Sequence, residues 1–161
     1  MSAMQYLKEC QLFQGISEEH VKLLVPYPNV ITLERNDYIF REGETGAFIY
    51  SVGTGRVAME MKIRLQAGGS EELATLDTLG PTEAFGLWGL VPPFVCVYSA
   101  RALLRSTLLR MDANALREAM TVHPELGYLI MTRTAEGLMR RLGRVRDLLA
   151  YQMALRKWST I

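Results

Sequence analysis

Apolar and polar residues alternate strictly between positions 56 and 65, and this pattern constrains the fold more than any other feature. The apolar set is Val57, Met59, Met61, Ile63 and Leu65, and the intervening set is Arg56, Ala58, Glu60, Lys62 and Arg64. A period of two is typical of a β-strand with one face turned inward and the other turned to solvent. The glycine-rich turn at 68–70 then leads to a partner strand at 71–76. This part of the chain is therefore predicted to form an antiparallel sheet.

Further short strands surround this hairpin. We expect them at 29–33, 38–40, 47–52, 96–103 and 106–111. The turns between them contain Asn36-Asp37 and several glycines, which favour backbone conformations that strands exclude. Seven or eight short strands with regular turns predict a sandwich or roll that hides its edges. The predicted fold is mainly β with flanking helices (α+β): a β-roll, or double-stranded β-helix jelly roll, followed by a long C-terminal helix.

Helices are predicted at both ends of the roll. Ser17 precedes a helix that reaches Leu24, with two acidic residues in its first turn. Asp112 is positioned to cap a second helix, and Pro124 suits the first position of a third. We expect one domain in three parts: a helical lead-in at 1–28, a β-roll at 29–111, and C-terminal helices at 112–161 that include a dimerisation helix.

Apolar residues in the last predicted helix recur at alternating spacings of three and four over three heptads, which is the pattern of a coiled-coil seam. They are Tyr128, Met131, Ala135, Leu138, Leu142, Val145 and Leu149. We predict a homodimer whose interface contains Met131, Leu138, Leu142, Val145 and Leu149; the alternative is a helix folded back on its own roll. The remaining face carries Arg133, Arg140, Arg141, Arg144 and Arg146. We expect these arginines to form a solvated flank of the coiled coil, with contact to nucleic acid as the less favoured reading.

Composition limits the compartment and the partners. The net charge of +1 gives no general attraction to nucleic acid, and the two cysteines, Cys10 and Cys96, provide no disulfide framework. The N-terminus lacks the layout of a signal peptide, and no apolar run approaches the ~20 residues that cross a bilayer. We expect a cytoplasmic protein without membrane contact. Too few residues follow the seam for a helix-turn-helix, so no DNA-binding domain is expected.

Catalytic and metal-binding motifs are not found in the sequence. It contains no Gly-x-Ser-x-Gly elbow, Walker loop or His-Glu-x-x-His motif. His20, His123 and the two cysteines lie far apart without zinc-like spacing, so we expect surface or capping histidines and inert thiols. We predict no enzyme, no cofactor and no metal. A cupin-type enzyme, which shares the roll architecture, would need a histidine cluster and is disfavoured.

Six segments, in order, resemble the cyclic-nucleotide-binding domain family, the CRP/FNR-like sensor module of many bacterial regulators. They are residues 12–17, 38–44, 48–57, 79–86, 109–112 and 123–126. In that family a short helical turn between two strands holds the ligand. The resemblance implies a glutamate for the ribose 2′-hydroxyl directly after the Phe85-Gly86 pair, and an arginine for the cyclic phosphate further along the loop. Backbone amides of the turn would complete the anion site.

The sequence departs from this family pattern at both charged positions. Leu87 occupies the glutamate position, and the arginine position falls on Phe94 or on Cys96, depending on the direction of counting. No arginine or lysine lies between Arg64 and Arg101. Our candidate ligand-binding set is Phe85, Gly86, Leu87, Trp88, Gly89, Leu90, Phe94, Cys96 and Val97. Trp88 and Phe94 could line an apolar cavity or could fill the inherited site as core.

These departures predict the function. An arginine–phosphate bond contributes about 1.5–3 kcal/mol, so losing it together with the ribose acceptor weakens binding by roughly 10²- to 10⁴-fold. We expect a non-catalytic regulatory domain that does not bind cyclic AMP or cyclic GMP in the usual mode. It would bind a small apolar or neutral ligand instead, or a protein partner if the pocket is closed. The alternative is a sensor of cyclic nucleotides or dinucleotides that uses Arg101, Arg105 or backbone amides.

Overall fold

Two four-stranded antiparallel sheets form the centre of the computed structural model, which describes residues 3–24, 26, 28–64 and 70–158. One sheet has the order β1-β8-β3-β6, and the other has the order β2-β7-β4-β5. The strands are β1 (Pro28–Leu33), β2 (Tyr38–Phe40), β3 (Phe48–Thr54), β4 (Val57–Arg64), β5 (Glu71–Leu79), β6 (Ala84–Phe85), β7 (Ser99–Ala102) and β8 (Ser106–Asp112). The predicted β-roll fold with flanking helices is confirmed.

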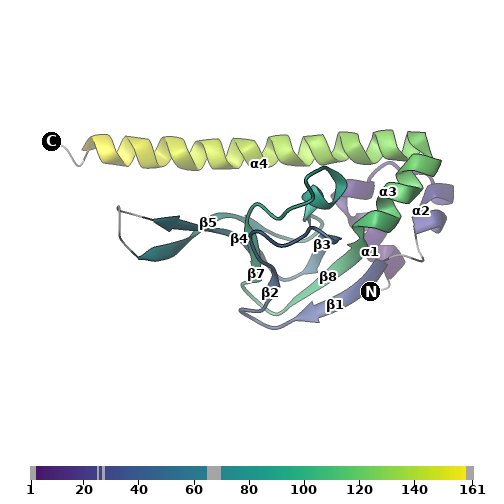
Figure 1. The fold of residues 1–161 in the computed structure, drawn as a ribbon, viewed down its shortest axis with the longest axis horizontal. Coiled ribbons are helices and arrows are strands. Elements are labelled where there is room, and N and C mark those ends of the chain that lie inside the picture. Colours follow the sequence, from purple (N-terminus) through teal and green to yellow (C-terminus); the bar gives the residue numbers. More distant parts are fainter. Residues whose placement is uncertain (1–2, 25, 27, 65–69, 159–161) are drawn as a thin grey trace.

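Helices flank the roll at both ends of the chain (Figure 1). They are α1 (Ala3–Glu9), the 3₁₀ turn η1 (Gln11–Phe13), α2 (Glu18–Leu24), α3 (Ala113–Val122) and α4 (Pro124–Trp158). A second 3₁₀ turn, η2 (Leu87–Leu90), lies within the roll between β6 and β7. The Ser17 hydroxyl accepts from His20 N at 3.2 Å, and Asp112 Oδ1 accepts from Ala115 N at 2.8 Å. Both predicted caps, and Pro124 as the first residue of α4, are confirmed.

Two apolar clusters stabilise this arrangement. One lies between the β1-β8-β3-β6 sheet and the helices, where Leu7, Leu116 and Ile130 are fully buried. The other fills the inside of the roll, between the two sheets, around Phe85 and Leu108. Residues of β8 therefore alternate between the two clusters, as the period-two pattern requires.

Some strands begin or end at residues that differ from the prediction. Strand β5 extends to Leu79, whereas β7 begins only at Ser99 because the preceding segment is irregular. Pro92 and Pro93 donate no backbone hydrogen bond, and Phe94 has a positive φ of 58°.

The outward face of β4 was also expected to be solvated, yet Ala58 and Glu60 are buried. Glu60 is compensated by Arg101 on the neighbouring strand β7. Leu65 and the glycines of the predicted turn lie outside the described residues.

Helix α4 runs along the roll in its first half, and its second half extends on the same side as the projecting β4–β5 hairpin (Figure 1). Leu126, Ile130 and Thr134 are buried on the roll side. The predicted seam lies on another face, where Leu138, Leu142 and Leu149 are 49%, 61% and 59% exposed. Met131 is exposed as well, and Val145 is only partly buried. The helix is thus both folded along its own roll and left with an uncovered apolar stripe.

Candidate functional site

The turn that carries the family resemblance begins at Gly86, between β6 and η2. Gly86 has a φ of 74°, and a Cβ atom there would lie 2.9 Å from the Phe48 carbonyl oxygen. Only glycine fits this left-handed position without strain. Phe85 is fully buried in the roll interior, so the pair fixes the direction in which η2 leaves the sheet.

Aromatic side chains fill the roll interior beneath η2. Trp88 packs edge-on against Tyr98 at 4.4 Å and against Phe40 at 5.4 Å between ring centroids. Phe85 stacks on Tyr50 at 5.3 Å. Such contacts stabilise beyond the area that they bury. Trp88 therefore acts as part of the core, which is one of the two roles that the sequence left open.

Trp88 also has the second role, because it borders an apolar cavity of about 280 Å³ between η2 and α4. The cavity is lined by Leu87, Trp88, Val91, Val97, Tyr98, Thr134, Leu138 and Arg141. Its single charged lining residue, Arg141, donates to the Ala84 carbonyl oxygen at 3.0 Å and lies 3.9 Å from the Asp77 carboxylate. Its Nε makes no hydrogen bond within the described residues, and Asp77 lies closer to Arg144, at 2.6 Å. The site therefore offers an apolar wall with one partly engaged cation at its border.

Buried polar groups without hydrogen-bond partners interrupt this apolar wall. The Tyr98 hydroxyl and Thr134 Oγ1 are buried and have no hydrogen-bond partner among the residues that the structure describes. Burial raises the pKa of Tyr98 to about 12, so its phenol is neutral at physiological pH. Unpaired buried hydroxyls are costly, and a ligand with one or two polar atoms would relieve that cost. The cavity is therefore suited to a mostly apolar, uncharged molecule.

The predicted ligand-binding residues lie in several separate parts of the structure. Leu87, Trp88 and Val97 border the cavity under α4, whereas Phe85, Gly86, Gly89 and Leu90 support the turn. Phe94 lies outside the cavity, beneath the Arg117 guanidinium at 4.5 Å, and Cys96 is buried beside a different cavity. The two possible arginine positions thus lie away from Leu87, because the irregular segment before β7 turns them aside.

That second cavity, of about 290 Å³, opens between β2, β3 and β8 and includes a residue that the sequence did not single out. Arg110 lies on the inward face of β8, two residues after the buried Leu108. Its guanidinium stacks over Phe48 at 4.6 Å, and its Nε is buried without a hydrogen-bond partner in the described part of the chain. An arginine at an inward strand position was the signal that could have identified it.

Arg101 and Arg105, proposed from the sequence as nucleotide ligands, are already engaged. Arg101 forms a fork with the buried Glu60 carboxylate and donates to Asn36 Oδ1 at 2.7 Å. The Glu60 hydrogen bond raises the pKa of Arg101 further above its ordinary value. Arg105 pairs with Glu34 on the surface at 3.1 Å. Neither arginine borders the cavity under α4.

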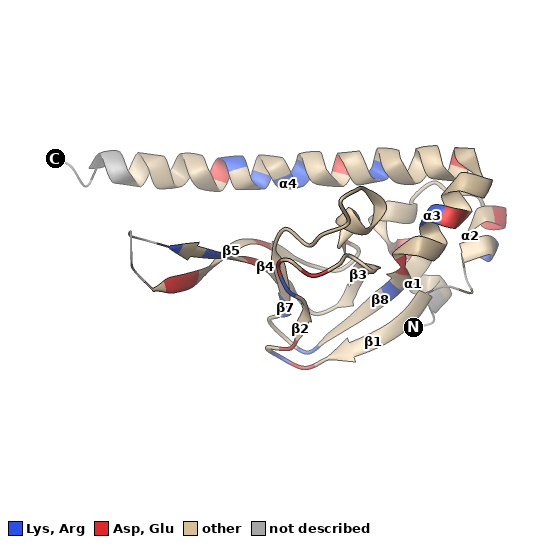
Figure 2. Cartoon of the chain, viewed as in Figure 1, with Lys and Arg blue, Asp and Glu red and all other residues tan. Residues whose placement is uncertain are grey.

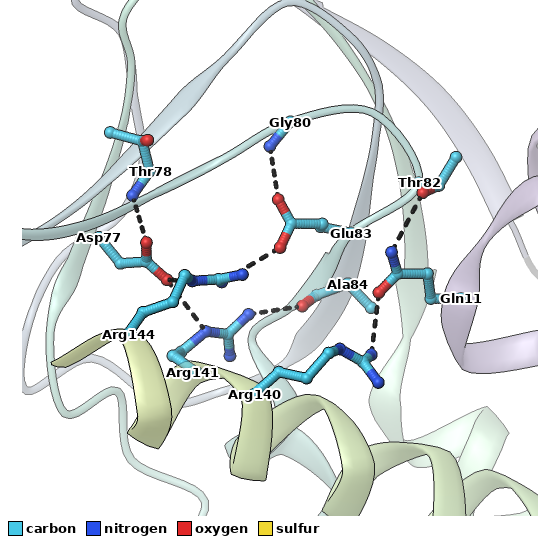
Figure 3. A network of polar contacts seen from close by, with 10 residues as sticks. All are labelled: Gln11, Asp77, Thr78, Gly80, Thr82, Glu83, Ala84, Arg140, Arg141 and Arg144. Carbon is cyan, nitrogen blue, oxygen red and sulfur yellow. Dashed lines mark hydrogen bonds and ion pairs between the residues drawn. The ribbon is translucent and has the colours of Figure 1, made fainter. Parts of the chain in front are cut away.

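The arginines of α4 do not form a solvated flank. Figure 2 shows the basic residues gathered in the middle of α4, and Figure 3 shows them directed at the roll. Arg144 reaches Asp77 at 2.6 Å and Glu83 at 3.1 Å, while Arg140 donates to Gln11 at 3.0 Å. Arg133 similarly donates to the Gln14 carbonyl oxygen. Only Arg146, paired with its neighbour Asp147, fits the solvated description. These contacts fasten α4 to the roll beside the β5–β6 turn.

Replacing Asp77 by alanine should weaken this attachment. The Asp77 side chain is 9% exposed and faces both Arg141 and Arg144, which would lose their counter-charge. We expect a loss of about 1–3 kcal/mol in the free energy of unfolding, between the values for surface and buried ion pairs. Urea denaturation measures it, with Asp147→Ala as the surface control. A loss below about 0.5 kcal/mol would contradict a structural role for these arginine contacts.

The histidines are not isolated in the structure, contrary to expectation. His20 and His123 approach within 5.7 Å between ring centroids, and His20 Nε2 lies 3.3 Å from Glu125 Oε1. His123 also ends α3, so the expected capping role is partly met.

Cys10 and Cys96 are free and buried, and burial raises the pKa of each thiol, which disfavours the reactive thiolate.

Comparison with known proteins agrees with this architecture. The sequence profile described as "Cyclic nucleotide-binding domain" matches residues 30–123, which is more than half of the chain. The chain belongs to the cyclic nucleotide-binding domain family. Among solved structures, the domain resembles a putative cyclic nucleotide-binding protein from Geobacter metallireducens, with a TM-score of 0.75, 20% identity, and coverage of 88% of this chain and 99% of that one.

Two curated relatives are bacterial transcriptional regulators. The cyclic AMP receptor protein of Thermus thermophilus is 32% identical over 92% of this chain and 66% of the relative. A CRP-like cAMP-activated global transcriptional regulator of Mycobacterium tuberculosis is 26% identical over 90% of this chain and 62% of the relative. The chain thus spans less than two thirds of their lengths. None of the helices in the described residues, the long α4 included, is apolar enough over a sufficient length to cross a membrane.

Proposed function

We propose that this domain is a non-catalytic regulatory sensor whose ligand is small, mostly apolar and uncharged. The observation that carries the proposal is the cavity between η2 and α4, where Leu87 stands at the position that the family resemblance assigns to a glutamate. Its volume of about 280 Å³ is just below the usual range for ligand pockets, about 300–1,000 Å³, which fits a small ligand. The relatives named for cyclic AMP share the fold, and this domain would use it for a different molecule.

Helix α4 is suited to report whether the cavity is occupied. Leu138 borders the cavity and also belongs to the exposed apolar stripe. A ligand inserted beside Leu138 would press on α4, whose position is held by the Asp77 and Glu83 ion pairs. Ligand binding in the cavity would then change the position of the exposed apolar stripe on α4. We propose that this stripe pairs with a second copy of the chain.

A thermal-shift screen of small neutral compounds tests this proposal. A ligand present at 100 times its Kd stabilises by about 2.7 kcal/mol, which corresponds to a rise in Tm of about 5–10 °C for a chain of this size. Val97→Phe should abolish that rise by closing the cavity mouth, whereas Val95→Phe, two residues away and outside the cavity lining, should not. Native mass spectrometry of the purified protein would identify a ligand that co-purifies. A bound ligand whose effect survives Val97→Phe would contradict the proposed position.

A second candidate ligand class is favoured by Arg110. Its guanidinium has no ion pair among the described residues and faces a cavity lined by Phe40, Phe48 and Tyr50. Glu44 also lines this cavity, and its carboxylate accepts from Arg41 N at 3.0 Å. A small aromatic carboxylate would supply the missing counter-charge. In the same screen, stabilisation by anions that Arg110→Met removes and Val97→Phe leaves unchanged would favour this site over the cavity under α4.

A further inference from the structure

Three side chains with metal-ligating atoms meet where the N-terminal helices contact the start of α4. His20 belongs to α2, His123 is the residue that ends α3, and Glu125 lies in the first turn of α4. One ligand atom from each lies within 4.8 Å of the other two. We propose that these residues bind a divalent transition metal, with Zn²⁺ as the expected ion. The site is separate from the apolar cavity and does not depend on the proposed function.

The separation between His20 and Glu125 fits two ligands of one metal ion and is long for a charge-assisted hydrogen bond. His20 Nε2 and Glu125 Oε1 are 3.3 Å apart. A charge-assisted hydrogen bond between such groups is usually about 2.7–2.9 Å long. Tetrahedral Zn²⁺ with bonds of about 2.0–2.1 Å holds its ligand atoms about 3.3–3.4 Å from each other. The pair therefore already has the spacing of two zinc ligands, and side-chain rotation of His123 would bring in the third.

The surroundings orient His20 for this role. Ser17 Oγ lies 3.1 Å from His20 Nδ1, and this contact leaves Nε2 directed at Glu125. A partner on the second ring nitrogen is the usual arrangement for a metal-bound histidine, because it fixes the tautomer and the ring orientation. The His20 side chain is 18% exposed and constrained, whereas Glu125 is 68% exposed and free to rotate towards an ion.

The two histidines and the glutamate indicate which class of metal would bind and how the ion would affect the helices. Two imidazoles and one carboxylate suit Zn²⁺, and they leave a fourth position for water. His123 is anchored by its backbone, which donates to the Ala119 carbonyl oxygen at 2.9 Å and accepts from Gly127 N at 3.0 Å. A bound ion would thus tie α2 to the junction between α3 and α4, and it would fix the point from which α4 leaves the roll.

Zinc titration of the full, untagged chain tests the site. Isothermal calorimetry should give one Zn²⁺ per chain, and Zn²⁺ in excess should raise the Tm by several degrees. His20→Ala and His123→Ala should each weaken binding at least tenfold and remove the zinc-dependent rise. Glu125→Gln should weaken binding as well. Glu118→Gln is the control, since the Glu118 carboxylate bonds only its neighbour Asn114 in the structure and lies outside the cluster.

Cobalt absorption provides a readout that does not require any variant to fold. Co²⁺ on the wild-type chain should give the visible bands of tetrahedral nitrogen and oxygen coordination, without a thiolate charge-transfer band. A thiolate band would assign the ion to Cys10 or Cys96 and overturn the proposal. So would a wild-type chain that takes up no Zn²⁺, which would leave His20 and Glu125 as an ion pair only, or zinc binding that both histidine variants retain.

Discussion

Replacing Leu142 by glutamate is expected to convert the protein from a dimer into a monomer at micromolar concentration. Leu142 is at the centre of the exposed stripe on α4 and is 61% exposed in the single chain. The stripe repeats every three and four residues over three heptads, so two parallel copies can interlock along it. An uncovered apolar stripe of this length is unusual on a monomer.

The size of the effect follows from burial and charge. Covering one leucine contributes about 1.5–3 kcal/mol, and each dimer contains two copies of the changed position. Losing both contributions and burying two like charges should raise the dimer dissociation constant by at least roughly 10²- to 10⁴-fold. Sedimentation velocity measures the change directly.

A matched control separates pairing from helix stability. Ala150 is exposed on α4 outside the heptad seam, so Ala150→Glu adds the same charge without changing the interface. It should remain dimeric, and circular dichroism should show equal helix content for both variants. A wild-type chain that sediments as a monomer, or a Leu142→Glu variant as dimeric as wild type, would rule out pairing through this stripe.

Cyclic AMP and cyclic GMP are expected to bind this domain at least roughly 10²- to 10⁴-fold more weakly than a family member with both charged groups. An arginine–phosphate contact contributes about 1.5–3 kcal/mol, and the ribose contact adds to it. Leu87 cannot accept from a ribose hydroxyl, and the nearest cation, Arg141, is engaged by Asp77 and the Ala84 carbonyl oxygen. Seating a phosphate against Leu87, Val97 and Leu138 would also require its desolvation without compensation.

Patterns among neighbouring residues in the sequence predicted the positions of strands and helices well. Period-two alternation located β4, and cap chemistry placed the starts of α2 and α3 to the residue, because these features depend on neighbours in the sequence. The family resemblance identified the turn at Gly86 for a related reason, since its left-handed backbone and the close Phe48 carbonyl oxygen require glycine at this position.

Contacts between distant segments were the part that the sequence did not reveal. The sequence predicts solvated arginines on α4 because Asp77 and Glu83 lie 67 and 61 residues before Arg144 along the chain, and only the fold brings them to α4. The same holds for His20 and His123, which join two helices that are remote in sequence. Arg110 was overlooked because its inward direction depends on strand register. Charged residues are thus the hardest to interpret from sequence, since their partners decide their role.

The central claim is that the cavity beneath α4 lacks the glutamate and arginine that the family resemblance implies for a cyclic nucleotide, and that its charged lining residue, Arg141, is held by the Ala84 carbonyl oxygen and Asp77. Isothermal calorimetry of the purified chain with cyclic AMP, and separately with cyclic GMP, measures this most directly. We predict no heat of binding at nucleotide concentrations up to about 100 μM. The protein used should be folded and should be stabilised by a ligand in the apolar-ligand screen. A dissociation constant in the low micromolar range for either nucleotide would contradict the account.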